Sequence, residues 1–234
     1  MKGLCYVVFD MDGTLFDAWS VAFPAFVHTF QALRERGVNV DLPSEGELRR
    51  TLGMTYRKMW STLLGFDDPE LALWADQTMR GKELELLKAG EGRLYPGVSE
   101  GISKLAASGL RLFIASNGEA NYLSAILERF SLRSYFAGVY DAFSFRAARK
   151  EELVGRIVDE YGLSSSGGAI VGDRASDLEA GAAHGLYRVA CTYGYGSWEE
   201  LRGADAYVRS FPEAVRILLT RKERGEAGVT TFHA

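Results

Sequence analysis

Carboxylates follow two apolar segments of this 234-residue chain, directly where each apolar run ends. Asp10 and Asp12 come after the first run, together with Thr14, and Asp173 and Asp177 come after a later one. Carboxylates that gather at one site repel each other, so some would be protonated unless a cation is present. No histidine or cysteine accompanies them, which disfavours zinc and copper, whereas ligands that are all oxygen suit Mg²⁺. The residue types therefore predict a magnesium site.

A hydroxyl and an ammonium group would add anion-binding capacity to these carboxylates. Ser116 and Asn117 follow another apolar run and offer hydroxyl, amide and backbone donors for phosphoryl oxygens. The same pair is also a common helix cap, so both uses stay open. Lys150 leads into a later helical segment and adds positive charge for a bound anion. Together these groups indicate metal-assisted phosphoryl transfer with a carboxylate nucleophile.

These residues lie far apart in the sequence and need a scaffold that brings them together. Apolar, β-prone runs predict strands at residues 4–9, 110–115, 139–145, 169–171, 186–191 and 206–209. Apolar residues at helical spacing predict helices at 98–109, 123–130, 151–161, 176–184 and 212–219. This alternation predicts an α/β fold with a doubly wound parallel sheet covered on both faces. Sites in such sheets lie beyond the carboxyl ends of the strands, which is where the polar residues stand.

Residues 18–93 carry no strand pattern and read as an all-helical insert. Ser44 and Glu47 fit a capping box, residues 56–64 fit a helix, and Asp68-Pro69 opens another helix. We therefore predict an α/β core of residues 1–17 and 94–220 with a helical domain of residues 18–93. Residues 221–234 are charged and small, and we expect them to form a flexible tail.

Composition and charge limit the classes of function. Hydrophobic residues make up 47% and charged residues 25% of the chain, as in ordinary globular proteins. A net charge of −4 disfavours nucleic acid or an anionic membrane as the main partner, and no apolar run is long enough to span a bilayer. Cys5 and Cys191 lie in separate apolar runs and are expected to be reduced core thiols. We expect a cytoplasmic protein, a monomer or homodimer, that acts on a small molecule.

Four segments, in this order, resemble the motifs of the haloacid dehalogenase superfamily. They are Phe9-Asp-Met-Asp-Gly-Thr-Leu15, Ile114-Ala-Ser-Asn-Gly118, Lys150, and Ile170-Val-Gly-Asp-Arg-Ala-Ser-Asp177. The stretch Tyr95-Pro-Gly-Val98 and the helical insert after the first motif are similar to the phosphoglycolate-phosphatase-like branch, in which the insert is a cap domain. The resemblance covers nearly the whole chain apart from the tail, and it implies a Rossmann-like core.

The resemblance implies a role for each matching residue. Asp10 would attack phosphorus to form an aspartyl-phosphate, and Asp12 would protonate the leaving oxygen and then activate water. Mg²⁺ would be held by the carboxylates of Asp10 and Asp173 and by the backbone carbonyl of Asp12. Asp177 would hold a metal-bound water or orient Lys150. Lys150 would also offset the charge on Asp10.

The resemblance also implies a set of substrate contacts. Ser116 and Lys150 would bind the phosphoryl group, beside Asn117, and Thr14 would position the loop. In the family this lysine is often followed by proline, whereas two glutamates follow here, and Arg149 stands beside it; we assign the role to Lys150. In the cap, the glycine-containing run of residues 50–57 would face the substrate. Arg50 or Arg57 is the candidate there for binding a second anionic group, although an arginine at the surface without a ligand is the commoner case.

The expected function is that of a magnesium-dependent phosphatase of a small phosphorylated metabolite. A phosphosugar mutase of the same family would use the same aspartates and return the phosphoryl group to its substrate. Dehalogenation is disfavoured because that branch usually lacks an acid at the position of Asp12. A non-catalytic binding protein on this fold is the third alternative. Phosphoglycolate, a sugar phosphate, a nucleoside monophosphate and pyrophosphate all remain candidate substrates.

Overall fold

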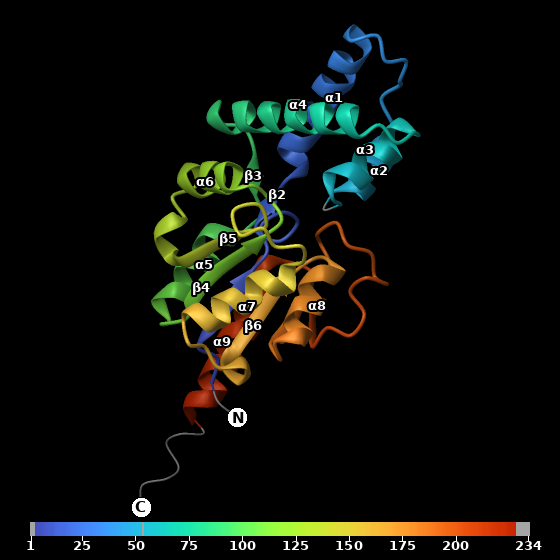
Figure 1. Ribbon diagram of the computed structural model, residues 1–234. Helices are drawn as coiled ribbons and strands as arrows, with labels where there is room; N and C mark the ends of the chain where they lie inside the picture. The colour runs from blue at the N-terminus through green and yellow to red at the C-terminus, as the bar shows by residue number, and fades with distance from the viewer. Residues whose placement is uncertain (1–2, 53, 228–234) are drawn as a thin grey trace, which may run out of the picture. The chain divides into compact units, whose positions relative to one another are not determined.

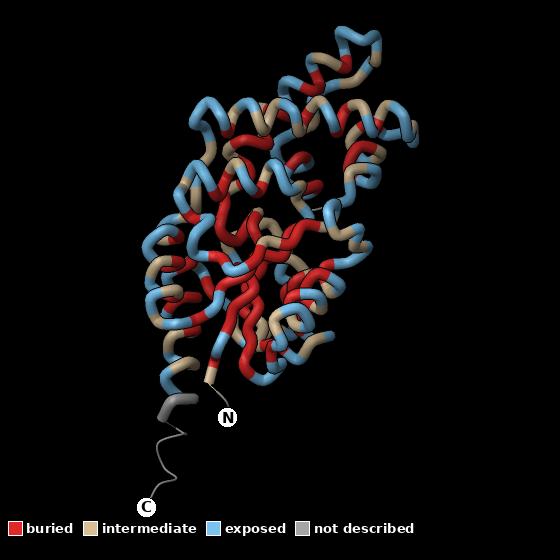
Figure 2. The backbone as a smooth tube through the Cα atoms, turned by 60° about the vertical axis from the view of Figure 1, so that its left-hand side comes forward, coloured by how far each residue is buried: buried red, intermediate tan, exposed pale blue. Residues whose placement is uncertain are grey.

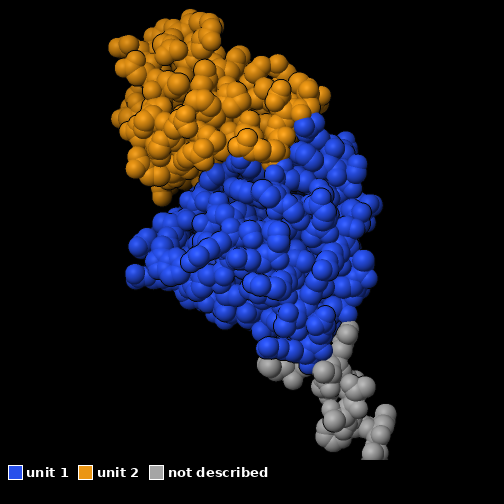
Figure 3. Space-filling view, turned by 180° about the vertical axis from the view of Figure 1, so that it is seen from behind, with its two compact units in different colours: residues 1–17, 94–234 blue, residues 18–93 orange. Residues whose placement is uncertain are grey.

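The computed structural model describes residues 3–52 and 54–227 (Figure 1). The chain divides into two compact units, which Figure 3 distinguishes by colour. Unit 1 comprises residues 1–17 and 94–234, and unit 2 comprises residues 18–93.

A six-stranded parallel sheet forms the centre of unit 1. Its strands, in spatial order, are β5 (Phe136–Asp141), β4 (Arg111–Ser116), β1 (Tyr6–Phe9), β6 (Gly168–Gly172), β7 (Tyr187–Cys191) and β8 (Ala206–Val208). All four residues of β1 are buried, because apolar side chains on both faces of the strand have a helix layer to pack against. Figure 2 shows the same burial along most of the sheet. The predicted doubly wound parallel sheet is confirmed.

Helices cover both faces of this sheet. On one face α7 (Lys150–Glu160) packs beside α8 (Ala175–Ala183), and on the other α5 (Val98–Ala107) packs beside α9 (Phe211–Ala227) (Figure 1). Successive residues of β1 alternate between the two layers. Val8 joins the core cluster that contains Leu153 and Ile157 of α7, whereas the ring of Phe9 lies 5.9 Å from that of Phe211 in α9. A further helix, α6 (Ala120–Arg129), follows β4.

The register of the central strands explains where the chain leaves the sheet. Phe9, the last residue of β1, pairs with Ile114 of β4 on one side and with Val171 of β6 on the other. The residues that follow these three strands therefore emerge together at the carboxyl edge of the sheet. This edge receives all the polar residues that the sequence places after strands.

The bounds of two predicted elements differ most from the structure. The strand expected at 139–145 lies at Phe136–Asp141, because the Asp141 side chain accepts a hydrogen bond from the backbone N–H of Ser144 at 2.7 Å and turns the chain. The helix expected to end at residue 219 continues to Ala227, so residues 221–227 of the predicted tail are helical. The Arg221 guanidinium there lies 3.5 Å from the centre of the Tyr187 ring, which ties this extension to the sheet. Residues 228–234 lie outside the described part of the chain.

The cysteines behave differently from each other. Cys191 is buried in β7, as expected, but Cys5 is exposed. Cys5 stands just before β1, where its backbone already bonds to the neighbouring strands but its Sγ lies near the surface and donates to the Gly3 carbonyl at 3.3 Å. The prediction of a core thiol at Cys5 is therefore wrong.

The described residues of unit 2 form four helices. They are α1 (Trp19–Glu35), α2 (Glu45–Thr51), α3 (Tyr56–Leu64) and α4 (Pro69–Lys88). The fully buried Trp60 of α3 packs between Phe26 and Phe30 of α1, with ring centres 6.1 and 6.0 Å away. Ser44 and Glu47 form the predicted capping box at the start of α2. Asp68 caps α4, where it accepts hydrogen bonds from two backbone N–H groups at 3.1 and 3.0 Å.

Two short strands, β2 (Phe16–Asp17) and β3 (Arg93–Leu94), pair with each other where the chain passes from unit 1 to unit 2 and back. Within the described residues, no helix combines the length and the apolar character that crossing a bilayer would require.

Candidate active site

A tight turn after β1 places the first carboxylates at the carboxyl edge of the sheet. The backbone carbonyl of Met11 accepts hydrogen bonds from the N–H groups of Leu15 and Phe16, both at 2.9 Å, which folds the chain back. Gly13 has a φ of +85°, and a Cβ there would lie 2.2 Å from Oδ2 of Asp173. Only glycine therefore fits between the turn and the Asp173 carboxylate.

Three buried carboxylates and one buried ammonium meet at this edge. Oxygens of Asp10, Asp173 and Asp177 lie within 4.8 Å of one another. The Nζ atom of Lys150 donates to Oδ1 of Asp10 at 2.7 Å and to Oδ1 of Asp177 at 2.6 Å. The Lys150 side chain is only 3% exposed. The structure thus brings together four residues from three separate segments that the sequence assigned to one site.

The electrostatics of this cluster follow from burial and charge. Burial raises the pKa of Asp10 to about 6, and the charge of Lys150 limits the rise. Burial, reinforced by the charges of Asp10 and Asp177, raises the pKa of Asp173 well above its ordinary value. Burial alone would lower the pKa of Lys150, but the two carboxylates that contact it raise the pKa above its ordinary value. The ammonium group therefore stays charged at neutral pH.

The cluster fits a divalent cation. Three buried carboxylates meet one ammonium there, and burial first and the neighbouring carboxylates second raise the pKa values of Asp10 and Asp173, which a bound cation would oppose. Every acidic ligand atom is oxygen, which matches Mg²⁺. Asp177 differs from the other two, because its Oδ2 also accepts a hydrogen bond from the backbone N–H of Arg174 at 2.9 Å. Protein donors thus engage both of its oxygens, and the contact with Lys150 favours a positioning role.

Asp12 stands apart from this cluster with a partner of its own. The hydroxyl of Tyr122, in α6, donates to Oδ1 of Asp12 at 2.8 Å. The loss of water around Asp12 and the nearby charge of Asp10 raise the pKa of Asp12 to about 7. Near neutral pH this carboxyl group is populated in both its protonated and its ionised form.

The predicted phosphate-binding residues lie at the end of β4 and in the turn after β1. Ser116 is buried at the end of β4, where its Oγ accepts from the N–H of Gly118 at 3.1 Å, while Asn117 is exposed. Thr14 is buried, and its Oγ1 donates to Oδ1 of Asp173 at 3.4 Å. The Arg149 side chain is 72% exposed and pairs with Glu151, in contrast to the buried Lys150. These contacts support the choice of Lys150 as the site residue.

The predicted substrate contact of unit 2 stays a prediction. Arg50 is exposed on α2. Arg57, in the same run, pairs with Asp67 within unit 2 at 3.7 Å. Gly53, the glycine of that run, lies outside the described residues.

The loop after β7 contributes contacts that the sequence reasoning missed. The Tyr193 hydroxyl donates to the Thr14 carbonyl at 2.8 Å, and the Tyr195 N–H donates to Oδ2 of Asp173 at 2.7 Å. A Cβ at Gly196 would lie 1.9 Å from the Asp173 carbonyl oxygen, so the loop backbone presses against that residue. The position of this loop directly after a parallel strand was the signal in the sequence that could have assigned it to the site.

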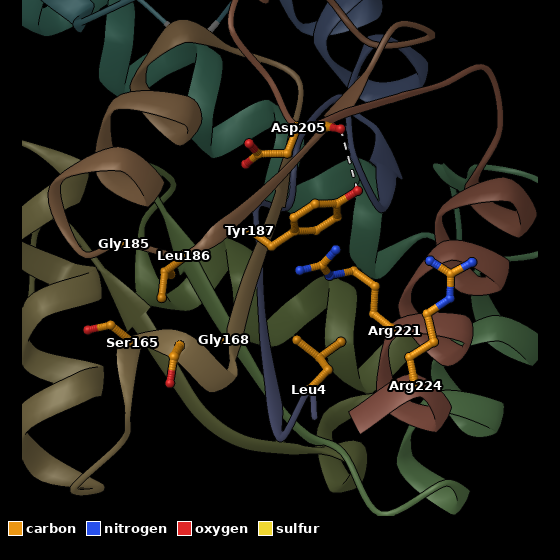
Figure 4. Close-up of a pocket in the computed structure, with 10 residues that line it drawn as sticks. Leu4, Ser165, Gly168, Gly185, Leu186, Tyr187, Asp205, Arg221 and Arg224 are labelled. Carbon is orange, nitrogen blue, oxygen red and sulfur yellow. Dashed lines mark hydrogen bonds between the residues drawn. The ribbon is translucent and has the colours of Figure 1, made fainter. Parts of the chain in front are cut away.

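The opposite edge of the sheet holds a separate cavity of about 300 Å³ (Figure 4). Its lining includes Leu4, Gly168 and Tyr187, which stand at or just before the amino ends of β1, β6 and β7. Arg221 and Arg224 reach it from α9. None of the predicted catalytic, metal-binding or phosphate-binding residues lines it, so the two edges of the sheet differ in chemistry.

Comparison with known proteins agrees with the predicted family. Residues 7–191 match the model of the haloacid dehalogenase-like hydrolase family. A phosphoglycolate phosphatase from Mesorhizobium japonicum is 30% identical over 220 residues, which cover 89% of this chain and 88% of that protein. A 5'-nucleotidase from Pseudomonas aeruginosa is 25% identical over 197 residues, covering 84% and 86% of the two chains.

Solved structures show the same fold. A haloacid dehalogenase-like family hydrolase from Streptococcus pneumoniae superposes with a TM-score of 0.80 at 21% identity, covering 92% of this chain and 98% of that one. CbbY from Rhodobacter sphaeroides, in complex with phosphate, superposes with a TM-score of 0.76 at 24% identity, covering 90% and 96%. The chain therefore belongs to the haloacid dehalogenase-like hydrolase family, which confirms the resemblance of its motifs and identifies it as a hydrolase.

Proposed function

We propose that this protein is a magnesium-dependent phosphatase of a small phosphorylated metabolite. The observation that carries the proposal is the buried cluster of Asp10, Asp173, Asp177 and Lys150 beside Asp12 at the carboxyl edge of the sheet. Relatives named as phosphoglycolate phosphatases and as a 5'-nucleotidase support it. A cytoplasmic location and a monomeric or dimeric state belong to the same proposal.

Asp10 is the proposed nucleophile. Lys150 holds its Oδ1, which leaves Oδ2 to attack phosphorus and form an aspartyl-phosphate. The ammonium group keeps Asp10 ionised despite burial, and it offsets charge on the phosphoryl oxygens. Asp177 holds that ammonium in place from the other side.

Asp10, Asp173 and the backbone carbonyl of Asp12 are the proposed ligands of Mg²⁺. When bound, the ion would neutralise the carboxylates and the phosphoryl oxygens that meet there. Ser116 keeps its hydroxyl hydrogen for a phosphoryl oxygen, since its Oγ acts as an acceptor towards Gly118.

Asp12 is the proposed general acid and base. Its pKa of about 7 suits a group that first gives a proton to the leaving oxygen and then takes one from the attacking water. The helical unit 2 is assigned the role of the family's cap domain, with Arg50 as the candidate for a second anionic group of the substrate.

The test is phosphate release from a panel of small esters, measured with Mg²⁺ and with a chelator. The panel holds phosphoglycolate, sugar phosphates, nucleoside monophosphates and pyrophosphate, and the matched control is Asp10→Asn. We expect release that needs Mg²⁺, that is concentrated on one ester class, and that falls by on the order of 10³-fold or more in the variant. Near-normal activity of Asp10→Asn would overturn the choice of nucleophile. Isomerisation of a sugar phosphate, primed by its bisphosphate and without phosphate release, would establish the mutase instead.

A further inference from the structure

The Tyr122 hydroxyl has a specific place in the site. It donates to Oδ1 of Asp12 at 2.8 Å across 110 positions of sequence. Within the part of the chain that the structure describes, this is the one hydrogen bond recorded for the Asp12 side chain. Lys150, by contrast, contacts Asp10 and Asp177. The nucleophile thus has a cation as its partner, and Asp12 has a neutral hydroxyl.

Packing fixes the Tyr122 ring independently of that hydrogen bond. The ring meets Phe16 edge to face, with centres 6.3 Å apart and planes at 82°. On another side it approaches Gly118 so closely that a Cβ there would lie 3.2 Å from the ring. Phe16 is fully buried and belongs to the turn that carries Asp12, since its carbonyl accepts from the Gly13 N–H at 2.9 Å. The ring and the carboxyl group are therefore anchored to the same turn.

A neutral hydroxyl suits a carboxyl group that must change its protonation state. An ammonium partner would favour the ionised form and oppose proton donation. A tyrosine hydroxyl can donate to Oδ1 whether the carboxyl group is ionised or carries its proton on Oδ2, because Oδ1 accepts in both states. The hydrogen bond can thus persist while the proton on Oδ2 comes and goes.

We propose that Tyr122 is a positioning residue that holds Asp12 with Oδ2 directed at the leaving oxygen. The inference rests on the proposed phosphatase function. As the ester P–O bond breaks, its electron pair stays on the leaving oxygen, which takes the proton from Oδ2. In the second step Oδ2 takes a proton from the water that attacks the aspartyl-phosphate. Phosphate leaves, and the Asp10 carboxylate is regenerated. Tyr122 itself gains and loses no proton in the cycle.

This role predicts a dependence on the leaving group. Proton donation matters most for esters whose leaving oxygen is strongly basic, such as alkyl phosphates, and least for p-nitrophenyl phosphate. In Tyr122→Phe the ring and its packing remain while the hydroxyl is gone. We expect kcat/KM for the best alkyl ester of the panel to fall about 10- to 100-fold, and that for p-nitrophenyl phosphate to fall less than about 3-fold. Across substituted phenyl phosphates, kcat/KM should fall more steeply with leaving-group basicity than in the wild type.

The matched control is Tyr161→Phe. Its hydroxyl donates to the Ala137 carbonyl at 2.9 Å, away from the carboxyl edge of the sheet. We therefore expect kcat/KM to stay unchanged for both the alkyl ester and p-nitrophenyl phosphate. In an Asp12→Asn background, Tyr122→Phe should have no further effect on leaving-group dependence, because the group it positions is no longer an acid.

Equal losses on aryl and alkyl esters in Tyr122→Phe, or no loss on either, would overturn the positioning role while leaving the phosphatase in place. A further change on adding Tyr122→Phe to Asp12→Asn would overturn it as well. A wild-type protein that releases phosphate from neither ester would instead overturn the proposed function, and with it this inference.

Discussion

At the scale of single residues, two aspartates of one turn have been given different environments. Asp10 is buried against an ammonium group, and Asp12 is bonded to a phenolic hydroxyl. Burial raises the pKa of both carboxyl groups, to about 6 and about 7. The cation opposes the rise most directly at Asp10, which suits a nucleophile, and the neutral partner leaves Asp12 able to carry a proton.

Lys150 and Arg149 are neighbours in sequence but differ in what their removal should do. Lys150→Ala would leave Asp10 and Asp177 buried without their shared cation, so we expect loss of phosphate release and of about 3 to 5 kcal/mol of stability. Arg149→Ala breaks one exposed ion pair with Glu151 and should cost at most about 1 kcal/mol, with activity retained. Phosphate release and thermal unfolding of the two variants test this. Comparable activity losses would undo the assignment of Lys150.

At the scale of elements, the loop after β7 braces the site through its backbone. Tyr193 bonds to the turn after β1, and Tyr195 bonds to the Asp173 carboxylate. Gly194 and Gly196 allow this approach, because a Cβ at either would collide with Asp173. The two glycines thus have a steric function at this contact.

Two glycine-to-alanine substitutions should therefore change the stability of the protein in opposite directions. In Gly196→Ala the new methyl group would overlap the Asp173 carbonyl oxygen, so the loop must shift, with a loss of about 1 to 3 kcal/mol of stability and of most activity. In Gly81→Ala, within α4, the methyl group meets nothing within 4 Å, and stability should rise by about 0.5 to 1 kcal/mol. Denaturant unfolding and phosphate release measure both. A Gly196→Ala protein that matches the wild type would show that the loop does not brace Asp173.

An ion pair that responds to pH links β7 to the outermost strand of the sheet, β8. Arg188 of β7 donates to both carboxylate oxygens of Asp205, which precedes β8, at 3.0 and 3.1 Å. These hydrogen bonds hold the pKa of Asp205 below its ordinary value of 3.8. The pair therefore stabilises the fold above that value, and the stabilisation is lost as pH falls through the lower, folded-state pKa.

Asp205→Asn should consequently unfold at a lower temperature than the wild type at pH 7, by an amount equivalent to at most about 1 kcal/mol. The difference between the two proteins should shrink as the pH falls below about 4. Thermal unfolding from pH 7 to pH 3 measures it. A difference that stays constant over this range would mean that the charge of Asp205 is not what stabilises this edge.

At the scale of the whole molecule, local sequence patterns predicted which helices and strands form. Where some of them end depends on contacts that the local pattern does not show. Continuous apolar runs identified β1, and the caps at Ser44 and Asp68 placed two helix starts, because both signals depend on neighbours in sequence. The predicted end of β5 was wrong because the strand ends at a turn that the Asp141 side chain forms with the Ser144 N–H. The sequence analysis missed the continuation of α9 beyond residue 220, because a run of charged residues is equally typical of a flexible tail and of a solvent-exposed helix.

The same division applies to the candidate site. Rules about strand ends were enough to select Asp10, Asp173 and Asp177, and the order of the motifs added Lys150. The structure brings these four residues together. The same rules could not select Tyr122, which stands inside a helix, six positions beyond the end of β4. Its contact with Asp12 exists only once the sheet has formed.

The position of the two thiols has a practical consequence. Cys191 is buried, whereas Cys5 is exposed just before β1, at the end of the strand opposite Asp10. The chain holds no other cysteine. A maleimide dye should therefore attach once per native molecule, far along the strand from the carboxylates, with phosphate release unchanged and a second thiol reacting only after denaturation. Mass spectrometry would count the adducts, and two adducts in the native state would contradict the burial of Cys191. The protein thus carries its own handle for surface immobilisation, at the end of β1 away from Asp10.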